Sequence, residues 1–278
     1  MGQLEGKVAL VTGASGAIGG AIAIALAREG ARVVLQYNRG KEKAQAILDE
    51  VVKYQHQSYL IQGDLFKVET PTQLVDQTVR RYDRLDILVN AAGTYRRTPL
   101  AELTPTEFAE TMKLHVGVPL ELAGQAIKHM LAGSCILNFS SDCTLGHKRL
   151  DGIAYDIAKA GVIAMTQDLA RGLKDKGIRV NAIAPGYTLN ESHAKELKQN
   201  PERLEQLKEK SPTGRINEPE DIAKVAIELC KPDSQLTGEV PYVIGGIIYV
   251  EMRDVCRANI DKNNMHIFVE SCLPKKNT

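Results

Sequence analysis

Short apolar runs rich in β-branched residues alternate along this chain with longer stretches that have helical periodicity. Seven of the runs have the length and composition of buried strands: Val8–Val11, Arg32–Gln36, Ser58–Gln62, Ile87–Asn90, Cys135–Phe139, Arg179–Ala184 and Val240–Val243. Six stretches are expected to be helical: Ile18–Glu29, Lys41–Tyr54, Pro71–Tyr82, Thr106–Leu131, Ala154–Lys176 and Pro219–Leu229. Such alternation is typical of a parallel sheet covered on both faces. The pattern therefore predicts an α/β fold with a doubly wound parallel sheet of about seven strands.

The alternation continues without a linker or an internal repeat, which predicts a single domain over residues 1–246. Residues 247–278 do not continue it, although this extension contains two apolar pieces, Ile247–Val250 and His266–Val269. The charged segment Glu191–Lys210 follows the sixth predicted strand. It suits a mobile helical cover over a site, and it equally suits a solvated surface helix.

Composition narrows the class of protein. The chain has 278 residues, of which 44% are hydrophobic and 25% charged, and its formal net charge is +1. This balance argues against a nucleic-acid or membrane partner held by bulk electrostatics, and no apolar run is long enough to span a bilayer. The five cysteines form no CxxC pair and no metal-binding spacing. Without a recognisable signal peptide, they are expected to be free thiols in a cytoplasmic protein that acts on a small molecule.

A glycine-rich turn joins the first predicted strand to the first predicted helix. The sequence TGASGAIGG begins at residue 12, and its candidate phosphate-binding residues are Gly13, Ser15, Gly16, Ile18 and Gly19. Glycines at such a turn let backbone N–H groups approach a pyrophosphate, and the helix N-terminus favours its negative charge. The position of this turn, after a strand and before a helix, favours a dinucleotide site.

The end of the second predicted strand indicates which dinucleotide is preferred. A carboxylate there accepts a hydrogen bond from the ribose 2′-hydroxyl, whereas a basic residue accommodates a 2′-phosphate. The sequence offers Asn38 and Arg39 but no carboxylate. This favours NADP(H), with NAD(H) as the second choice. The alternative is that Arg39 is simply an exposed residue beside Lys41 at a helix start.

Candidate chemistry lies near the fifth predicted strand. Tyr155 and Lys159 are four residues apart, on one face of a predicted helix. An ammonium stabilises a phenolate and lowers its pKa towards the working range. Ser141 follows the fifth strand, where its hydroxyl could polarise the same carbonyl oxygen.

Together these motifs resemble the short-chain dehydrogenase/reductase family in its compact single-domain subtype. The resemblance covers about residues 4–246 and rests on motifs in the expected order: TGASGAIG at 12–19, Asp64-Leu65, NAAG at 90–93, Ser141, Tyr155-x-x-x-Lys159, RVNAIAPG at 179–186, and the TGE and GG elements near 237–246. It implies a Rossmann-like fold and hydride transfer with a nicotinamide cofactor.

The resemblance also implies roles for single residues. Tyr155 would be the acid/base, Lys159 would lower its pKa and bind the nicotinamide ribose, and Ser141 would hold the substrate oxygen. Further cofactor contacts are implied for Asp64, Leu65, Asn90, Ala91, Gly93, Pro185, Gly186 and Thr188. Members of the family usually form tetramers or dimers through the helices that match Thr106–Leu131 and Ala154–Lys176. The alternative function is that of a cofactor-binding regulator, a protein with this fold that does not catalyse a reaction.

The chain departs from the family pattern in four places. Gly16 comes one place early, so Ala17 takes a usual glycine position and a slightly altered turn is expected. His115 replaces the asparagine that supports the proton relay, where it could hold the relay water or be a core residue. The threonine expected after the Pro-Gly turn falls on Asn190, with Thr188 nearby. Finally, Ile244 stands where aspartate is common.

One conflict of spacing bears on the substrate. Counting from the fifth strand puts Ser141 at the substrate oxygen, whereas counting back from Tyr155 puts Asp142 there. Burial fixes a strand's register while loops absorb insertions, which favours Ser141. Pteridine reductases of this family use an aspartate at that position. The sequence therefore predicts reduction of a carbonyl, of the 3-oxoacyl-thioester or polyol/ketone type, with a pterin as the alternative substrate.

Overall fold

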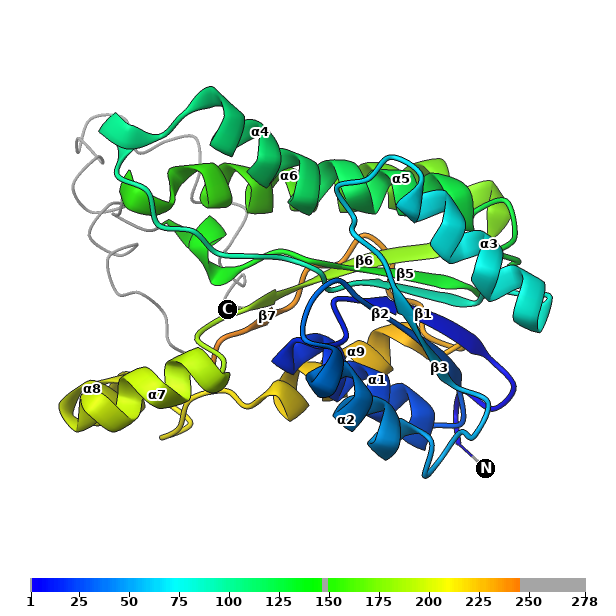
Figure 1. Ribbon diagram of the computed structural model, residues 1–278, viewed down its shortest axis with the longest axis horizontal. Helices are drawn as coiled ribbons and strands as arrows, with labels where there is room; N and C mark the ends of the chain where they lie inside the picture. Colours follow the sequence, from blue (N-terminus) through cyan, green and yellow to red (C-terminus); the bar gives the residue numbers. More distant parts are fainter. Residues whose placement is uncertain (1, 147–149, 246–278) are drawn as a thin grey trace, which may run out of the picture. The chain divides into compact units, whose positions relative to one another are not determined.

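The predicted apolar runs form one parallel sheet in the order β3-β2-β1-β4-β5-β6-β7 (Figure 1). The strands are β1 (Val8–Thr12), β2 (Arg32–Tyr37), β3 (Tyr59–Gln62), β4 (Ile87–Asn90), β5 (Cys135–Phe139), β6 (Arg179–Pro185) and β7 (Tyr242–Val243). The computed structural model describes residues 2–146 and 150–245. The apolar pieces predicted in residues 247–278 lie outside the described residues.

Only the last predicted strand is clearly shorter than expected. Tyr242 and Val243 form β7, whereas the apolar run begins at Val240. Pro241 interrupts that run and has no N–H to donate, although its carbonyl still accepts from the Ala184 N–H at 2.9 Å. A proline is tolerated here because β7 is an edge strand.

Helices cover both faces of the sheet, as Figure 1 shows. One face packs against α1 (Ala17–Arg28), α2 (Lys41–Val51) and α9 (Pro219–Cys230). The other packs against α3 (Thr70–Tyr82), α5 (Val118–Ala126) and α6 (Ile153–Gly172). The chain changes direction across the sheet between β1 and β4, so a crevice is expected beyond the carboxyl ends of these two strands. The candidate residues follow strands that end at this edge.

The stretch Thr106–Leu131 is not the single helix that the pattern predicted. It divides into α4 (Pro105–Met112), a π-helical turn over Lys113–Gly117, and α5. Pro119 explains the break, because it has no N–H for the carbonyl of His115 and its ring would collide with that carbonyl in a regular helix. The wider turn carries His115 into the interior, where it is only 3% exposed.

The charged segment Glu191–Lys210 forms two helices, α7 (Glu191–Gln199) and α8 (Pro201–Lys210). Pro201 fits the first position of α8, and the Asn200 side chain accepts a hydrogen bond from the Arg203 N–H at 3.2 Å. None of the helices in the described part of the chain is both long and apolar enough to cross a bilayer.

Candidate active site

The turn after β1 is built so that only glycine fits at two of its positions. Gly13 has a φ of +65°, and a Cβ there would lie 2.7 Å from Cα of Ala92. A Cβ at Gly19 would lie 2.5 Å from the carbonyl oxygen of Gly13. Gly16 caps α1 without a side-chain hydrogen bond, and Ala17 is the first helical residue. The helix N-terminus is therefore free of acidic or capping side chains, which suits an anion.

Gln36 holds this turn, and the sequence analysis did not identify it. Its side chain is 1% exposed; Oε1 accepts from the Gly13 N–H at 2.9 Å and Nε2 donates to the Gly63 carbonyl at 2.8 Å. Its own carbonyl accepts from the Ala14 N–H. The sequence does contain a sign of this role, a polar residue inside an otherwise apolar strand. A buried polar side chain needs hydrogen-bond partners.

The ends of β2 and β3 bring the predicted adenosine-side residues together. Asn38 donates from Nδ2 to Oδ1 of Asp64 at 3.3 Å, and the same carboxylate oxygen accepts from the Phe66 N–H at 3.0 Å. Leu65 is buried beside them. Arg39 is exposed, and no hydrogen bond or ion pair occupies it within residues 2–146 and 150–245. Its guanidinium is thus available to an outside anion.

The predicted residues at and after the end of β4 include a buried amide, that of Asn90. Asn90 donates to Oδ1 of Asn138 at 2.9 Å, and Asn138 donates to Oγ1 of Thr166 at 3.0 Å. Asn90 Oδ1 is buried and has no partner among the described residues. Ala91 is partly buried, and a Cβ at Gly93 would come within 2.8 Å of the His115 ring. An unpaired acceptor at this strand edge fits a site that a polar ligand completes.

The end of β6 places Thr188, rather than Asn190, beside the Pro185-Gly186 turn. The Thr188 hydroxyl donates to the Gly186 carbonyl at 2.9 Å, and its side chain is buried. Asn190 instead caps α7 by accepting from the His193 N–H at 2.9 Å. The unusual Ile244 packs on the turn, since a Cβ at Gly186 would lie 3.0 Å from its Cγ2 atom.

The predicted catalytic residues lie together at the start of α6 and the end of β5. Lys159 Nζ lies 5.3 Å from the ring centre of Tyr155 and donates to the Phe139 carbonyl at 2.7 Å. The Ser141 side chain lies close enough to the Tyr155 phenol to act on its pKa, and its hydroxyl donates to Oδ1 of Asp142 at 3.1 Å. The structure thus brings Ser141 to Tyr155, as the count from the strand predicted, with Asp142 directly beside it.

Burial governs the ionisation of these groups. It raises the pKa of Tyr155 above its ordinary value; Cys143, Asp142 and Tyr95 raise it further, and the hydrogen bond with Ser141 opposes them. Burial also lowers the pKa of Lys159 to about 8. Contrary to the expectation, Lys159 does not lower the pKa of Tyr155 in this structure, and its Nζ donates to the Phe139 carbonyl. The phenol stays protonated at neutral pH, which suits a proton donor.

His115 faces the same group. Its ring meets that of Tyr155 edge-on, with 5.2 Å between the ring centres. Nε2 lies 2.9 Å from the Thr94 carbonyl oxygen, and Nδ1 is buried without a partner among the described residues. Burial first, and then the charge of Lys159, lower the pKa of His115 to about 3. The imidazole is therefore neutral at every working pH.

This low pKa predicts a pH-dependent stability. The unfolded histidine titrates near 6.5, so the contribution of neutral His115 is complete above that pH and is lost as the pH falls towards 3. Between pH 7 and pH 5, wild type should lose about 2 kcal/mol more unfolding free energy than His115→Asn. Urea denaturation at both pH values measures this. Exposed His56→Asn is the control and should keep the wild-type slope; equal slopes for wild type and His115→Asn would contradict the prediction.

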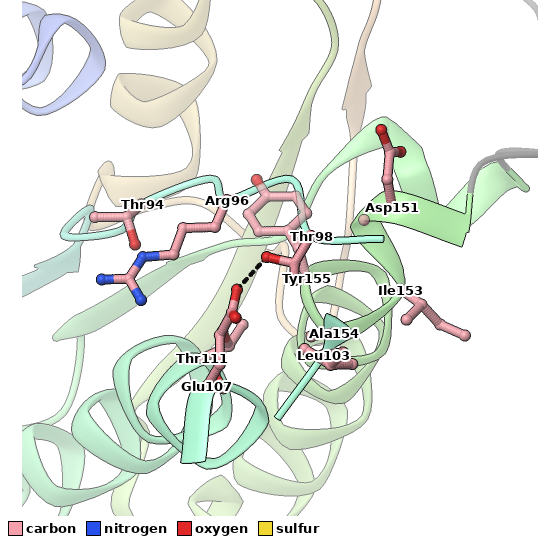
Figure 2. Close-up of a pocket in the computed structure, with 11 residues that line it drawn as sticks. Thr94, Arg96, Thr98, Leu103, Glu107, Thr111, Asp151, Ile153, Ala154 and Tyr155 are labelled. Atoms are coloured by element: carbon pink, nitrogen blue, oxygen red, sulfur yellow. Dashed lines mark hydrogen bonds between the residues drawn. The ribbon is translucent and has the colours of Figure 1, made fainter. Parts of the chain in front are cut away.

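A small polar pocket adjoins Tyr155 (Figure 2). It lies between the loop after β4, α4 and the start of α6, and its lining includes Thr94, Arg96, Thr98, Glu107, Thr111 and Asp151. Arg97 forms an ion pair with Asp151 at 2.8 Å, and the Thr98 N–H donates to the Asp151 carbonyl at 2.7 Å. These contacts join the loop after β4 to the segment that precedes α6; residues 147–149 lie outside the described residues.

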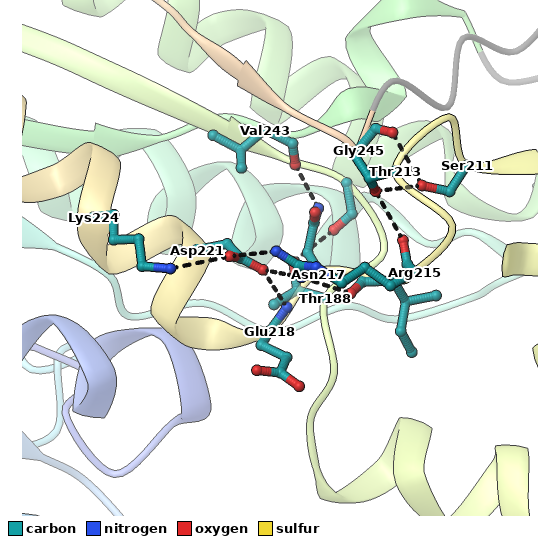
Figure 3. A network of polar contacts seen from close by, with 12 residues as sticks. Thr188, Ser211, Thr213, Arg215, Asn217, Glu218, Asp221, Lys224, Val243 and Gly245 are labelled. Atoms are coloured by element: carbon teal, nitrogen blue, oxygen red, sulfur yellow. Dashed lines mark hydrogen bonds and ion pairs between the residues drawn. The ribbon is translucent and has the colours of Figure 1, made fainter.

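The segment that follows β6 carries α7 and α8 from a base of polar contacts (Figure 3). The Leu189 N–H donates to the Asn217 carbonyl at 2.8 Å, and the Asn217 amide donates to the Val243 carbonyl at 2.6 Å. Close to this base, Glu191, the first residue of α7, forms an exposed ion pair with Lys43 of α2. The segment therefore forms two helices that are anchored where α7 begins, rather than one surface helix.

Comparison with known proteins agrees with this arrangement. A family model described as enoyl-(acyl carrier protein) reductase matches residues 13–248. An uncharacterised oxidoreductase of Methylorubrum extorquens is 35% identical over 89% of this chain and 100% of its own length. The 3-oxoacyl-[acyl-carrier-protein] reductase of Aquifex aeolicus is 32% identical over 88% of this chain and 98% of its own length.

A solved structure has the same fold. It is a short-chain dehydrogenase of Burkholderia cenocepacia in complex with NADP, with a TM-score of 0.80 and 29% identity over 88% of this chain and 99% of that one. The seven-stranded parallel sheet, the glycine turn at its switch point and the matches over most of the chain lead to one conclusion. The chain belongs to the short-chain dehydrogenase/reductase family, whose members are oxidoreductases that use a nicotinamide cofactor.

Proposed function

We propose that this protein reduces a ketone or an activated imine, with NADP(H) preferred over NAD(H). The observation that carries the proposal is the grouping of Ser141, Tyr155 and Lys159 beside the crevice at the carboxyl edge of the sheet. When bound, the reduced cofactor supplies the hydride that the carbonyl carbon accepts.

The chain's own residues then handle the oxygen and the proton. Tyr155 gives its phenolic proton to the carbonyl oxygen, and its raised pKa keeps that proton available at neutral pH. The Ser141 hydroxyl donates a hydrogen bond to the same oxygen as negative charge develops on it. Lys159 holds the nicotinamide ribose and, once turned from the Phe139 carbonyl, stabilises the phenolate left on Tyr155.

The residues around the crevice fit a dinucleotide. The uncapped N-terminus of α1 suits the pyrophosphate, with Gly13, Ser15, Gly16, Ile18 and Gly19 around it. Asn90 ends β4, and its buried Oδ1 is an acceptor without a partner among the described residues. We assign the remaining contacts to Asn38, Asp64, Leu65, Ala91 and Gly93 on the adenosine and ribose side, and to Pro185, Gly186 and Thr188 at the nicotinamide.

The NADP(H) preference rests on Arg39. The guanidinium follows β2 and is exposed, with no ion pair inside the described residues. A Cβ at the neighbouring Gly40 would lie 3.9 Å from Cβ of Ser15, so the end of β2 adjoins the glycine turn. This placement suits a 2′-phosphate bound between the two segments.

The substrate class rests on similarity and on one contact. The Aquifex relative is named a 3-oxoacyl reductase, which favours a 3-oxoacyl thioester or a polyol-type ketone. Asp142 is buried and accepts from Ser141 at 3.1 Å, so an aspartate stands next to the proposed oxygen site. That contact keeps a pterin as the second candidate substrate.

A substrate panel tests this function. Loss of NADPH absorbance is followed with an acetoacetyl thioester, small hydroxyketones, an oxidised pterin and an enoyl thioester. We expect turnover of a carbonyl substrate. Turnover of the pterin alone would favour the alternative, and turnover of the enoyl thioester alone would make the hydride acceptor a C=C bond. NADPH binding without turnover of any compound would favour a cofactor-binding regulator.

We also propose that the protein assembles as a homodimer or homotetramer through α4, α5 and α6. Leu120 of α5 and Ile157 of α6 are 43% and 45% exposed, so each of these two helices presents a large apolar side chain that a partner subunit could cover. The molar mass measured by light scattering at micromolar protein concentration tests the assembly. The mass of a monomer would contradict the proposal.

A further inference from the structure

We infer that Tyr242 of the edge strand β7 is a positioning residue for the substrate oxygen: its hydroxyl holds Thr144, and Thr144 in turn holds the backbone of Ser141. The inference rests on the proposed function, because it assigns a role at the oxygen site proposed above. Tyr242 acts through Thr144 and does not itself transfer a proton to the substrate.

The direction of the two hydrogen bonds follows from the hydroxyl protons. Thr144 Oγ1 lies 2.8 Å from the Ser141 carbonyl oxygen and 2.9 Å from the Tyr242 hydroxyl oxygen. A carbonyl can only accept, so the single hydroxyl proton of Thr144 goes to Ser141. The Tyr242 hydroxyl must therefore donate to Thr144 Oγ1. The two bonds form a chain of donors that runs from β7 to the residue at the proposed oxygen site.

The Ser141 side chain leaves the position of its own oxygen to the backbone. Its single hydroxyl proton goes to Oδ1 of Asp142 at 3.1 Å, and Oγ accepts from the Cys143 N–H at 3.3 Å. In the proposed reaction that proton turns to the substrate oxygen, so the hydroxyl changes its partner. The Ser141 carbonyl keeps its partners throughout. The bond from Thr144 Oγ1, at 2.8 Å, is shorter than the one from the Thr144 N–H, at 3.3 Å.

The backbone of Tyr242 is held on both sides. Before it, the Pro241 carbonyl accepts from the Ala184 N–H at 2.9 Å. After it, the Val243 carbonyl accepts from the Gly186 N–H at 2.9 Å, and the same carbonyl is seen in Figure 3. Proline also fixes its own φ, so the strand that carries the phenol has little freedom. Tyr242 therefore presents its hydroxyl from a fixed point.

The alternation of side chains directs this phenol towards α6. Val240 packs against the cluster that contains Val162 of α6, whereas Val243 packs in the core on the α9 side of the sheet. Successive side chains of a strand point to opposite faces, so Tyr242 lies on the face of Val240. The turn Asp142–Leu145 contacts α6 on that face. A phenylalanine would fill the same space, so only the hydroxyl distinguishes tyrosine here.

Tyr242→Phe removes this hydroxyl and keeps the ring. We expect kcat for the carbonyl substrate to fall by about threefold to tenfold, as for one lost hydrogen bond, with NADPH affinity unchanged. In the Ser141→Ala background the same substitution should cost less than about twofold, because the group that Tyr242 positions is already missing. Equal losses in both backgrounds would show a general effect on the fold and would overturn the inference. An unchanged kcat in the single variant would do the same.

Two substitutions at Thr144 test the middle of the chain. Thr144→Ser keeps the hydroxyl and should stay within about twofold of wild type in kcat, whereas Thr144→Val has nearly the same shape without it and should lose about tenfold or more. Adding Tyr242→Phe to Thr144→Val should then cost less than about twofold, because Tyr242 acts through Thr144. Additive losses, or a serine variant as impaired as the valine variant, would contradict the inference.

Hydrogen exchange separates this inference from the proposed function, because it needs no turnover. The Cys143 N–H donates to Ser141 Oγ and the Thr144 N–H to the Ser141 carbonyl, both at 3.3 Å. In Tyr242→Phe, amide exchange in the peptide of residues 141–146 should accelerate by about threefold or more, while exchange in α9 keeps the wild-type rate. If no compound of the panel turns over but this local acceleration occurs, the proposed function is wrong and the role of Tyr242 stands. Unchanged exchange in residues 141–146 would overturn the inference.

Discussion

Replacing Tyr155 with phenylalanine should lower kcat for the carbonyl substrate by at least about 10²-fold, and by as much as about 10⁴-fold. The ring and its edge-on contacts with Tyr95 and His115 remain, so the fold and the NADPH affinity should survive. Only the transferable proton is lost. Steady-state kinetics, with NADPH affinity measured separately, checks both parts of this expectation.

A matched control comes from a tyrosine far from the site. Tyr59 lies on the edge strand β3, where its hydroxyl donates to the Gln77 carbonyl at 3.3 Å. Tyr59→Phe should leave kcat unchanged. Comparing Ser141→Ala with Asp142→Ala tests the oxygen contact, and greater damage from Asp142→Ala would favour the pterin. A fully active Tyr155→Phe would exclude the proposed mechanism whatever the fold.

Arg39→Asp should reverse the cofactor preference. In wild type, NADPH should bind at least about tenfold more tightly than NADH, because the guanidinium pairs with the 2′-phosphate. In the variant, a carboxylate would repel that phosphate and accept from the 2′-hydroxyl of NADH, so NADH should bind more tightly. Isothermal titration calorimetry with both cofactors gives the two ratios.

Arg80→Asp provides the charge-matched control. Arg80 lies on the outer surface of α3 with its side chain 77% exposed, and it is remote from the end of β2. The substitution Arg80→Asp changes the net charge of the protein by the same amount as Arg39→Asp. It therefore shows how much of any loss in cofactor affinity comes from the change in net charge. Equal affinities of the wild type for NADPH and NADH would refute the role given to Arg39.

The sheet could be predicted from the sequence because its central strands, such as β1, β4 and β5, are buried along their whole length. Ile87–Asn90 and Cys135–Phe139 are apolar except for one asparagine each, and the structure places both strands at the predicted bounds. The exception was the last run, where Pro241 shortens the strand at the sheet edge. The effect of Pro241 depends on which neighbouring strand its backbone faces, and the pattern of apolar residues does not give that information.

The break in Thr106–Leu131 had a local signal that the helical periodicity concealed. Apolar residues keep their spacing across the π-helical turn, so the pattern suggested one helix. Pro119 was visible in the sequence, yet a proline also fits the first turn of a new helix, which is where the structure has it.

The candidate site was predictable where sequence order fixes spatial order. Residues after parallel strands meet at one edge, so the glycine turn, Asn90 and Ser141 had to lie near one another. The supporting contacts were not predictable. Gln36 and Asn138 act through partners 23 and 28 residues away, Gly13 and Thr166, and only the folded chain shows which buried polar groups meet.

The hydrogen bond between Leu189 and Asn217 closes a loop at its neck, and this affects how the protein can evolve. Everything from residue 190 to residue 216 leaves the sheet and returns to almost the same point, while β6, β7 and α9 stay fixed around the neck. Lengthening or replacing such a loop costs little closure entropy, about 0.6 kcal/mol for each doubling of its length. Insertion, deletion or transplantation between relatives can therefore change what the loop encloses while Tyr155 and Lys159 keep their places. The neck makes this segment an exchangeable module on a catalytic base that does not change.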